Sequence, residues 1–286
     1  MTGRLRSGPL LREAARRLAA AGVPSPEFDA AELLAHTLGV NRPALAVAEV
    51  PPEAAVRFEA LLARRAAREP LQHLTGVAGF RYLDLAVGPG VFVPRPETEL
   101  LAGWAVDRAR AVAGTGETPV VVDLCTGSGA IALSVATEVP AARVHAVELD
   151  ERACGWAARN LEGSGVDLRQ GDMEEAFSDL DGTVHVVVSN PPYIPLAAFE
   201  SVVAEARDHD PALALWSGED GLDALRVVER VAARLLVPGG VVGAEHADLQ
   251  GDSAPAVFAR AGRWADVRDH HDLAGRPRFV TARLAR

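Results

Sequence analysis

The spacing of apolar residues changes near residue 119 and divides the sequence into two patterns. Upstream, apolar residues recur at helical spacing over residues 9–22, 26–39 and 52–68, each bounded by proline or glycine. Downstream, short runs rich in β-branched residues alternate with helical stretches. Because alternating strands and helices build parallel sheets, the sequence predicts an α/β domain that follows a small helical bundle.

Seven strands are predicted downstream, and their alternation with helices indicates a mostly parallel sheet covered on both faces. The strands lie at residues 120–124, 143–148, 168–172, 184–189, 240–246, 264–271 and 278–284, with helices at 130–137, 151–161, 222–236 and 254–261. Residues 80–87 alternate enough for a hairpin, and the proline-rich residues 94–99 lead into a helix that ends near Ala113. We therefore expect a helical domain over residues 1–75, a hairpin linker over 76–96 and the α/β domain over 97–286.

Composition and charge restrict the function classes. The chain has 286 residues, of which 49% are hydrophobic and 24% charged, as in ordinary globular proteins. Its net charge of −10 disfavours binding to the phosphate backbone of a nucleic acid, so direct contact with nucleic acid is not expected. Two distant cysteines and eight histidines without ligand spacing indicate neither a disulfide framework nor a metal site. Because no apolar segment suits a signal peptide or a membrane span, we expect a cytoplasmic location without membrane association.

The stretch Ser189-Asn190-Pro191-Pro192-Tyr193 carries the clearest chemical signal. It follows the apolar run 183–188, a predicted buried strand that the prolines must end. The carboxyl edge of an open α/β sheet is where ligands bind. The Asn190 side-chain carbonyl and the proline carbonyls can accept hydrogen bonds from a flat –NH2 group, and Tyr193 can supply a flat wall. A turn that only closes a loop is the alternative, but four such residues directly after a buried strand favour binding.

A turn of small residues, Cys125-Thr126-Gly127-Ser128-Gly129, lies between the first predicted strand and its helix. Free N–H groups at a helix start and close backbone approach suit a bound ligand. With Ala132 in the third position, the turn also resembles a dinucleotide fingerprint, so a nicotinamide cofactor stays open. Asp123 argues against it, because an acid at the strand end would repel a pyrophosphate. The same acid suits a cationic amino-acid group such as the methionine end of S-adenosylmethionine.

Three further residues are candidates for cofactor binding. Glu148 ends the second predicted strand, 19 positions after Gly129, where an acid can bind both hydroxyls of a ribose. An ordinary solvated carboxylate is the alternative. Asp172 could accept a hydrogen bond from an adenine amine, and Met173 could pack on the adenine face, with a plain loop as the alternative for both.

Together these motifs resemble the release factor glutamine methyltransferases, which are protein-(glutamine-N5) methyltransferases, over nearly the full length. The resemblance is carried by Leu74-Thr75-Gly76, Pro94-Arg95-Pro96-Glu97-Thr98-Glu99, residues 123–132, Glu148, residues 190–193 and Asp220-Gly221-Leu222. The run 94–99 is the most specific to this family, because base methyltransferases share residues 190–193 and the glycine motif. The resemblance implies a class I, Rossmann-like methyltransferase domain and an N-terminal domain that recognises the substrate.

The resemblance also implies transfer of a methyl group from S-adenosylmethionine to the glutamine amide nitrogen of the Gly-Gly-Gln motif in peptide chain release factors. It assigns the cofactor loop to residues 125–129 and the ribose acid to Glu148. With Asp123, Asp172, Met173 and Asn190, these are the predicted cofactor-binding residues. The resemblance assigns catalysis and substrate binding to Asn190, Pro191, Pro192 and Tyr193. Two departures stand out: Cys125 where glycine is usual, and Met173 where an aromatic residue is common beside adenine.

Other substrates stay open at this point. A ribosomal-protein glutamine methyltransferase shares much of the pattern, and an adenine-amine methyltransferase acting on nucleic acid shares both core motifs. The latter normally needs a basic region that flips the base, which a net charge of −10 disfavours. A non-catalytic binding module is disfavoured by the complete set of Asp123, Glu148 and residues 190–193. We expect a monomer whose partner is a release factor, with no metal.

Overall fold

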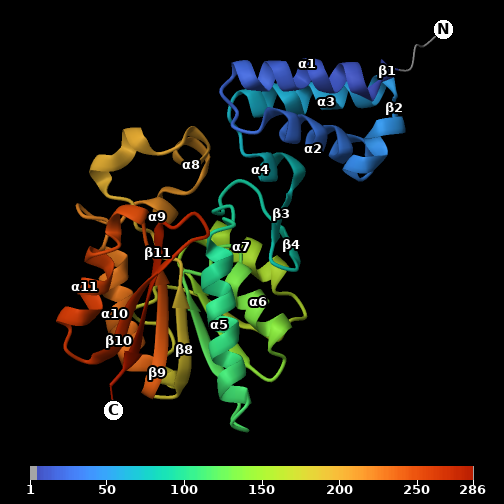
Figure 1. Ribbon diagram of the computed structural model, residues 1–286. Helices are drawn as coiled ribbons and strands as arrows, with labels where there is room; N and C mark the ends of the chain where they lie inside the picture. The colour runs from blue at the N-terminus through green and yellow to red at the C-terminus, as the bar shows by residue number, and fades with distance from the viewer. Residues whose placement is uncertain (1–4, 286) are drawn as a thin grey trace. The chain divides into compact units, whose positions relative to one another are not determined.

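The structure, a computed structural model, describes residues 5–285, and the chain divides into two units (Figure 1). The helical unit contains residues 5–77 and the short segment Val203–His209. The sheet unit contains Ala78–Val202 and residues 210–285. The chain therefore passes between the units three times, and it returns to the helical unit soon after the predicted turn at residues 190–193.

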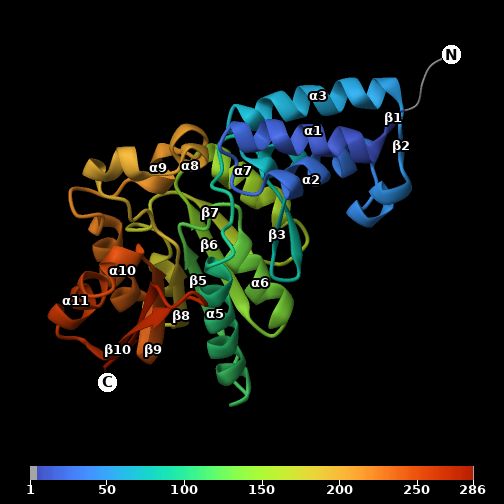
Figure 2. The same cartoon turned by 45° about the horizontal axis from the view of Figure 1, so that its top comes forward.

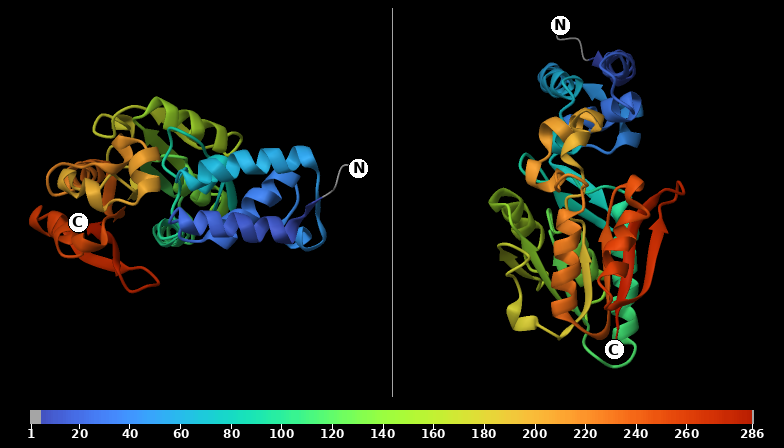
Figure 3. Two further views of the ribbon diagram at one scale, coloured as in Figure 1. Left: turned by 90° about the horizontal axis from the view of Figure 1, so that it is seen from above. Right: turned by 90° about the vertical axis from the view of Figure 1, so that its left-hand side faces the viewer.

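Three main helices form the helical unit, because each carries an apolar face at helical spacing. They are α1 (Ser7–Ala20), α2 (Pro26–Leu38) and α3 (Pro52–Ala66), accompanied by β1 (Leu5–Arg6), η1 (Arg42–Val47), β2 (Glu49–Val50), α4 (Leu71–Thr75) and α8 (Ala204–His209). The core of the unit includes Leu18, Leu33, Leu34, Phe58 and Leu62, and Figure 3 shows α1, α2 and α3 in shades of blue. The prediction of a helical bundle is confirmed.

Helix α8 is fixed to the bundle by charge pairs. Glu205 accepts hydrogen bonds from Arg65 at 2.9 Å and from Arg68 at 2.8 and 2.6 Å. Arg65 also donates to Asp29 of α2 at 2.7 Å, and its side chain is only 5% exposed. Burial alone would raise the pKa of Glu205, but the two guanidinium groups outweigh burial and hold that pKa at about 2.

The sheet unit is built on a sheet of seven strands in the order β10-β11-β9-β8-β5-β6-β7. These are β5 (Val120–Leu124), β6 (Arg143–Glu148), β7 (Asp167–Gln170), β8 (Val184–Ser189), β9 (Leu236–Glu245), β10 (Trp264–His271) and β11 (Pro277–Leu284). β11 is antiparallel to both of its neighbours, and the pairs from β9 through to β7 are parallel. The prediction of a mostly parallel seven-stranded sheet is confirmed.

Helices cover both faces of this sheet, as predicted (Figures 1 and 2). One core cluster joins the sheet to α5 (Thr98–Ala113), α6 (Ala130–Glu138) and α7 (Glu151–Asn160). A second cluster joins the other face to α10 (Asp223–Leu235) and α11 (Ser253–Arg260). The central strands β5 and β8 are buried from both sides, which explains their continuous runs of valine.

Two regions differ from what the sequence predicts. The hairpin consists of β3 (Val77–Phe80) and β4 (Leu83–Ala86), so its first strand begins before the predicted span. Its turn contains Arg81 at φ 52°, a conformation for which a glycine would have been the usual signal. Short elements also occupy the stretch after residue 193, namely η3 (Leu196–Ser201), α8 and α9 (Ala212–Leu215), which the sequence pattern did not predict.

The order of the strands creates a switch point between β5 and β8. From β5 the chain moves outward through β6 and β7, and it then returns to place β8 on the other side of β5. Connections leave the carboxyl ends of β5 and β8 in opposite directions, which opens the position where α/β proteins bind ligands.

Candidate active site

The turn at residues 190–193, which we call the acceptor turn, begins at the carboxyl end of β8. Ser189 is the register partner of Leu124 at the end of β5, and its hydroxyl donates to the Leu124 carbonyl at 2.7 Å. Asn190 and Cys125 therefore follow paired strand ends. The structure thus brings together, at one edge of the sheet, the start of the acceptor turn and the start of the predicted cofactor turn.

The backbone of the acceptor turn is held by a glutamine and a glycine. Gln250, in η4 (Asp248–Gln250), donates from Nε2 to the carbonyls of Tyr193 and Asp220, each at 3.1 Å. Gly221 has φ +77°, and a Cβ at this position would lie 2.3 Å from the Tyr193 carbonyl oxygen. The glycine of the sequence motif 220–222 is therefore required by the close approach of the acceptor turn.

A buried carboxylate connects the two polar side chains of the acceptor turn. Glu245, at the end of β9, accepts from the Thr98 hydroxyl at 2.7 Å and from the Tyr193 hydroxyl at 3.2 Å. Asn190 Nδ2 donates to Thr98 Oγ1 at 3.3 Å. Glu245 is 1% exposed, and burial raises its pKa to about 7 against the opposing effects of Thr98, Arg278 and Tyr193.

The run at residues 94–99 is fixed by an arginine. Arg95 donates to the carboxylate of Asp210 at 2.7 Å and lies over the Phe92 ring at 4.8 Å. Burial raises the pKa of Asp210 to about 6 despite the nearby guanidinium of Arg95. Thr98 follows three residues later as the first residue of α5, so this run delivers the hydroxyl that contacts Asn190.

The glycine turn, residues 125–129, adopts a backbone that glycine favours. Cys125, Gly127 and Gly129 have φ of 60°, 57° and 83°. The positive φ gives a physical reason for the usual glycine at position 125, because an L-residue there is strained by about 1 to 2 kcal/mol. The Ser128 side chain is buried, and the Ser128 backbone carbonyl accepts from Asn160 Nδ2 at 2.9 Å. We therefore expect the turn to contact a ligand through its backbone N–H groups.

The Asp123 carboxylate holds the glycine turn by hydrogen bonds. One of its oxygens, Oδ2, accepts from the Thr126 hydroxyl at 2.6 Å and from the Ala132 N–H at 3.1 Å. The other, Oδ1, is buried and has no hydrogen-bond partner within residues 5–285. Burial raises the pKa of Asp123 to about 7, with Thr126 and Ala132 opposing that shift. A buried carboxylate oxygen without a partner fits a cationic group of a ligand.

Glu148 lies where the sequence places the ribose acid, and it also supports the glycine turn. Its carboxylate accepts from the N–H groups of Gly127 at 2.8 Å and Asp150 at 3.0 Å. Burial raises its pKa, and these backbone donors oppose the shift. A carboxylate has about four lone-pair positions, so acceptor capacity is left for ribose hydroxyls.

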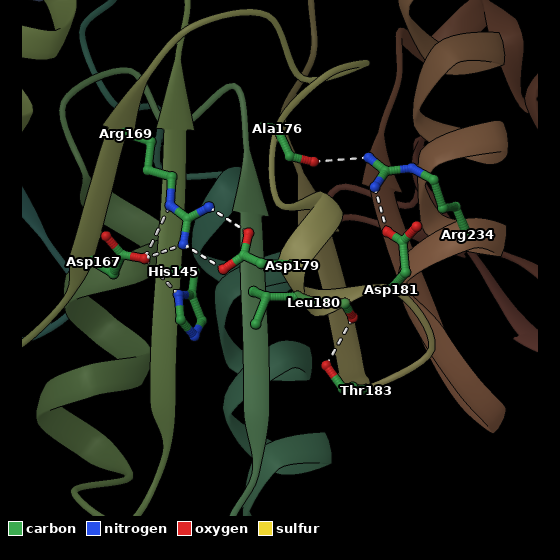
Figure 4. A network of polar contacts seen from close by, with 9 residues as sticks. All are labelled: His145, Asp167, Arg169, Ala176, Asp179, Leu180, Asp181, Thr183 and Arg234. Carbon is green, nitrogen blue, oxygen red and sulfur yellow. Dashed lines mark hydrogen bonds and ion pairs between the residues drawn. The ribbon is translucent and has the colours of Figure 1, made fainter.

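The middle of the segment 171–183, between β7 and β8, is held by two arginines (Figure 4). Arg169 of β7 donates to the two oxygens of Asp179 at 2.6 and 2.9 Å. Arg234 of α10 donates to the carbonyl of Ala176 at 2.7 Å. These contacts fix the loop three to seven residues beyond the predicted adenine-side residues Asp172 and Met173.

The predicted adenine-side residues lie at the start of that segment. Asp172 follows β7 and accepts from the N–H of Glu174 at 2.9 Å, which leaves its second oxygen for a ligand. The Met173 sulfur lies 3.6 Å from the Cys125 sulfur. The two departures from the family pattern therefore touch each other, so Met173 also supports the glycine turn.

The arrangement fits an S-adenosylmethionine site better than a metal centre. Asp123 could hold the cationic amine, Glu148 the ribose and the segment 171–183 the adenine. No cluster of His, Cys, Asp and Glu that could hold a metal ion occurs in the part of the chain that the structure describes. Among the same residues, no helix is long and apolar enough to cross a membrane.

Four residues that shape the site are missing from the sequence-based candidates: Thr98, Asp210, Glu245 and Gln250. Thr98 lies in a quoted motif without an assigned role. Glu245 shows a usable signal, because it is an acid inside the carboxyl end of a predicted strand, as Asp123 is. Asp210 and Gln250 act on residues 115 and 57 positions away, and nothing in the local sequence indicates those partners.

Known proteins resemble this chain along most of its length. Residues 9–76 match the family model described as the PrmC N-terminal domain, and residues 111–209 match the methyltransferase small domain. The release factor glutamine methyltransferase of Streptomyces coelicolor is 62% identical over 96% of both chains. That of Mycolicibacterium smegmatis is 48% identical over 96% of this chain and 97% of its own. A 4-amino-L-phenylalanine/4-methylamino-L-phenylalanine methyltransferase of Streptomyces pristinaespiralis is 44% identical over 89% and 88%.

Proposed function

This chain belongs to the release factor glutamine methyltransferase family, and from that premise we propose how its residues carry out the reaction. The chain is an S-adenosylmethionine-dependent methyltransferase that methylates a glutamine of peptide chain release factors. The methylated atom in our proposal is the side-chain amide nitrogen of the glutamine in the Gly-Gly-Gln motif. We assign the holding of that amide to the acceptor turn.

The observation that carries the proposal is the pairing of Ser189 with Leu124, which puts the acceptor turn beside the glycine turn. The sulfonium of S-adenosylmethionine, when bound, supplies the methyl group. The Asn190 side-chain carbonyl and the Pro191 carbonyl accept the two amide N–H bonds, which orients the nitrogen and stabilises positive charge that develops on it. Tyr193 and Pro192 flank the flat amide. The proton leaves to water late in the reaction, so the turn needs no strong base.

Substitution of Asn190 by alanine tests this assignment. The variant should lose at least about 100-fold in turnover, because a positioned acceptor is removed, while its affinity for S-adenosylmethionine stays within about threefold of the wild type. Mass spectrometry of a purified release factor measures the added methyl group and maps it to one residue. Asn41→Ala, which removes an exposed cap of η1 in the helical unit, is the matched control and should leave turnover at saturating release factor unchanged. Near-normal turnover by Asn190→Ala would sink the assignment.

The relative from Streptomyces pristinaespiralis raises a second candidate substrate, a small aryl amine, which also presents a flat –NH2 group. We propose the release factor as the substrate, because higher identity over nearly the whole chain links this protein to enzymes named for it. A parallel assay with a release factor, 4-amino-L-phenylalanine, a ribosomal protein and an adenine-containing oligonucleotide separates the alternatives. Methylation of any of the last three with the release factor left unmodified would overturn the proposal.

We further propose that the helical domain, residues 1–75, recognises the release factor, that residues 76–96 form a linker and that residues 97–286 carry the chemistry. Exposed apolar side chains of the helical unit, such as Val47 and Val56, support a recognition role. Val47→Glu and Val56→Glu should raise the KM for a whole release factor and leave the KM for a short Gly-Gly-Gln peptide unchanged. Equal effects on both substrates would contradict this division.

The remaining expectations concern the setting of the enzyme. We propose a cytoplasmic monomer that binds no nucleic acid directly, in keeping with the net charge of −10. Light scattering at several concentrations tests the monomer, and a titration with RNA and DNA at low salt tests the second statement. A concentration-dependent dimer or salt-sensitive nucleic-acid binding would require revision.

A further inference from the structure

Three polar side chains in the sheet unit form a hydrogen-bonded chain that ends at the proposed amide acceptor. Glu245 Oε2 accepts from Thr98 Oγ1 at 2.7 Å, and Thr98 Oγ1 lies 3.3 Å from Asn190 Nδ2. Glu245 is 1% exposed and Thr98 is 4% exposed, so water does not compete for these bonds. The three residues come from β9, α5 and the end of β8, which are far apart in the sequence.

The direction of each hydrogen bond follows from the donors available. An ionised carboxylate only accepts, so the single hydroxyl hydrogen of Thr98 is committed to Glu245. The Thr98 oxygen can then only accept from Asn190, and the Asn190 amide must turn its NH2 end toward Thr98. The Asn190 carbonyl oxygen consequently faces the other way, where it is available to a substrate N–H.

We propose that Thr98 and Glu245 are positioning residues that fix which end of the Asn190 amide meets the substrate nitrogen. An asparagine side chain is nearly symmetric in shape, so packing alone distinguishes its two ends poorly. If the amide were reversed, two NH2 groups would face each other and the substrate nitrogen would be repelled. The inference rests on the proposed role of Asn190 and adds the means by which that role is enforced.

Protonated Glu245 would no longer fix the direction of the hydrogen bonds between Glu245, Thr98 and Asn190. A neutral carboxyl can donate to Thr98, which frees the Thr98 hydroxyl to donate to Asn190 and allows the reversed amide. Burial places the pKa of Glu245 at about 7, so this change falls within an accessible range. The active form is the ionised one, so the rate should fall as the pH drops through about 7.

The groups that face Glu245 come from several elements. Arg278 of β11 favours its ionised form and Glu97, just before α5, opposes it, while Tyr193 donates from the acceptor turn. The residue that follows β9, His246, is engaged elsewhere, because its ring nitrogens lie 2.8 Å from the Ala247 carbonyl and 2.8 Å from Asp269. Among these groups, Glu245 is the one that contacts the Thr98 hydroxyl directly.

The pH dependence of turnover at saturating cofactor tests the proposal in wild type, Thr98→Val and Thr98→Ser. Valine has the shape of threonine without the hydroxyl, so we expect turnover to fall about 10- to 100-fold and to stay flat between about pH 6 and pH 9. Serine keeps the hydroxyl and should restore both the rate and the fall below about pH 7. Cofactor affinity should change by less than about threefold in either variant.

Two outcomes would overturn the proposal: a wild-type rate in Thr98→Val, or the same fall in rate near pH 7 in that variant. The second outcome would point to Asp123, whose pKa is also about 7. Glu245→Gln provides an independent check if the valine variant folds poorly, because glutamine does not titrate and its profile should be flat. Loss of turnover in Asn190→Ala together with normal turnover in Thr98→Val would reject the positioning role alone, whereas activity in Asn190→Ala would reject the proposed function itself.

Discussion

Asp123 and Glu245 are two buried carboxylates near the carboxyl ends of β5 and β9, the two neighbours of β8, and they differ in what their oxygens contact. Burial raises the pKa of each to about 7. Asp123 uses one oxygen for the glycine turn and keeps the other without a partner among the described residues. Glu245 uses both oxygens, one for Thr98 and one for Tyr193. We therefore expect the first carboxylate to contact a ligand and the second to act through other residues.

Glu205 differs from these two carboxylates because it accepts hydrogen bonds from arginine side chains. It is also largely buried, yet its pKa is held at about 2 because Arg68 and Arg65 donate directly to it. Asp123 and Glu245 accept only from hydroxyl and backbone donors. Asp210 shows that one cation is not always enough, because its fully buried carboxylate accepts from Arg95 and burial still raises its pKa to about 6. The balance between burial and cation pairing therefore decides the direction of the shift. A carboxylate without a cation remains open to protonation or to a cationic ligand.

The largest expected effect is on the free energy of unfolding, and it comes from Gly221, which approaches the acceptor turn that Glu245 contacts. Gly221→Ala should lower the free energy of unfolding by about 3 kcal/mol, because its Cβ would lie 2.3 Å from the Tyr193 carbonyl at φ +77°. Gly239→Ala is the matched control, since Gly239 has φ +88° and nothing within 4 Å, and it should cost about 1 kcal/mol. Urea denaturation measures both. Equal losses of unfolding free energy in the two variants would contradict the close approach of Gly221 to the Tyr193 carbonyl.

The next effect isolates the charge of Asp123. Asp123→Asn keeps an oxygen for Thr126 and Ala132 and removes the negative charge, so cofactor affinity should fall roughly 10- to 100-fold while the fold is retained. Calorimetric titration with S-adenosylmethionine measures the change. Asp107→Asn, which removes an exposed carboxylate of α5, is the control and should leave the affinity unchanged. Unchanged affinity in Asp123→Asn would remove the distinction between the two buried carboxylates.

A smaller effect tests the role of cation pairing in the helical unit. Glu205→Gln should lower the free energy of unfolding by about 2 kcal/mol near pH 7, because Arg65 and Arg68 lose a charged acceptor. The pKa of Glu205 is lowered in the folded state, so its contribution is present above the unfolded pKa and is lost as the pH falls toward about 2. Urea denaturation at several pH values measures the difference from wild type. A difference that grows on acidification would contradict the pairing.

Local pattern was sufficient for the parts of the site that lie close together in the sequence. Strands β6 and β8 begin and end where the sequence predicts, and the signal in β8 is a run of valines typical of a buried parallel strand. The partners of Asp123 are 3 and 9 residues away, within one strand–turn–helix motif. That motif has a recognisable composition, so the acid and the glycine turn were predicted together.

The parts that could not be predicted depend on contacts between distant segments. Glu245 meets Tyr193 and Thr98 across 52 and 147 residues, and only the strand order β9-β8-β5 brings these segments together. The same holds for α8, whose Glu205 meets Arg68 across 137 residues. The hairpin was misplaced for another reason, because Arg81 adopts φ 52° without the glycine that usually marks such a turn.

The smallest expected effect concerns Cys125, the departure on the Asp123 side. Cys125→Gly relieves a positive φ of 60°, worth about 1 to 2 kcal/mol, but glycine loses more backbone entropy on folding, about 0.5 to 1 kcal/mol. The variant also loses the contact with Met173 at 3.6 Å. These opposing contributions should leave the free energy of unfolding within about 1 kcal/mol of the wild type, measured by urea denaturation. A Cys125→Gly, Met173→Phe double variant should recover cofactor packing if the two departures compensate each other, whereas strictly additive effects on cofactor affinity would show that the sulfur contact has no role in the site.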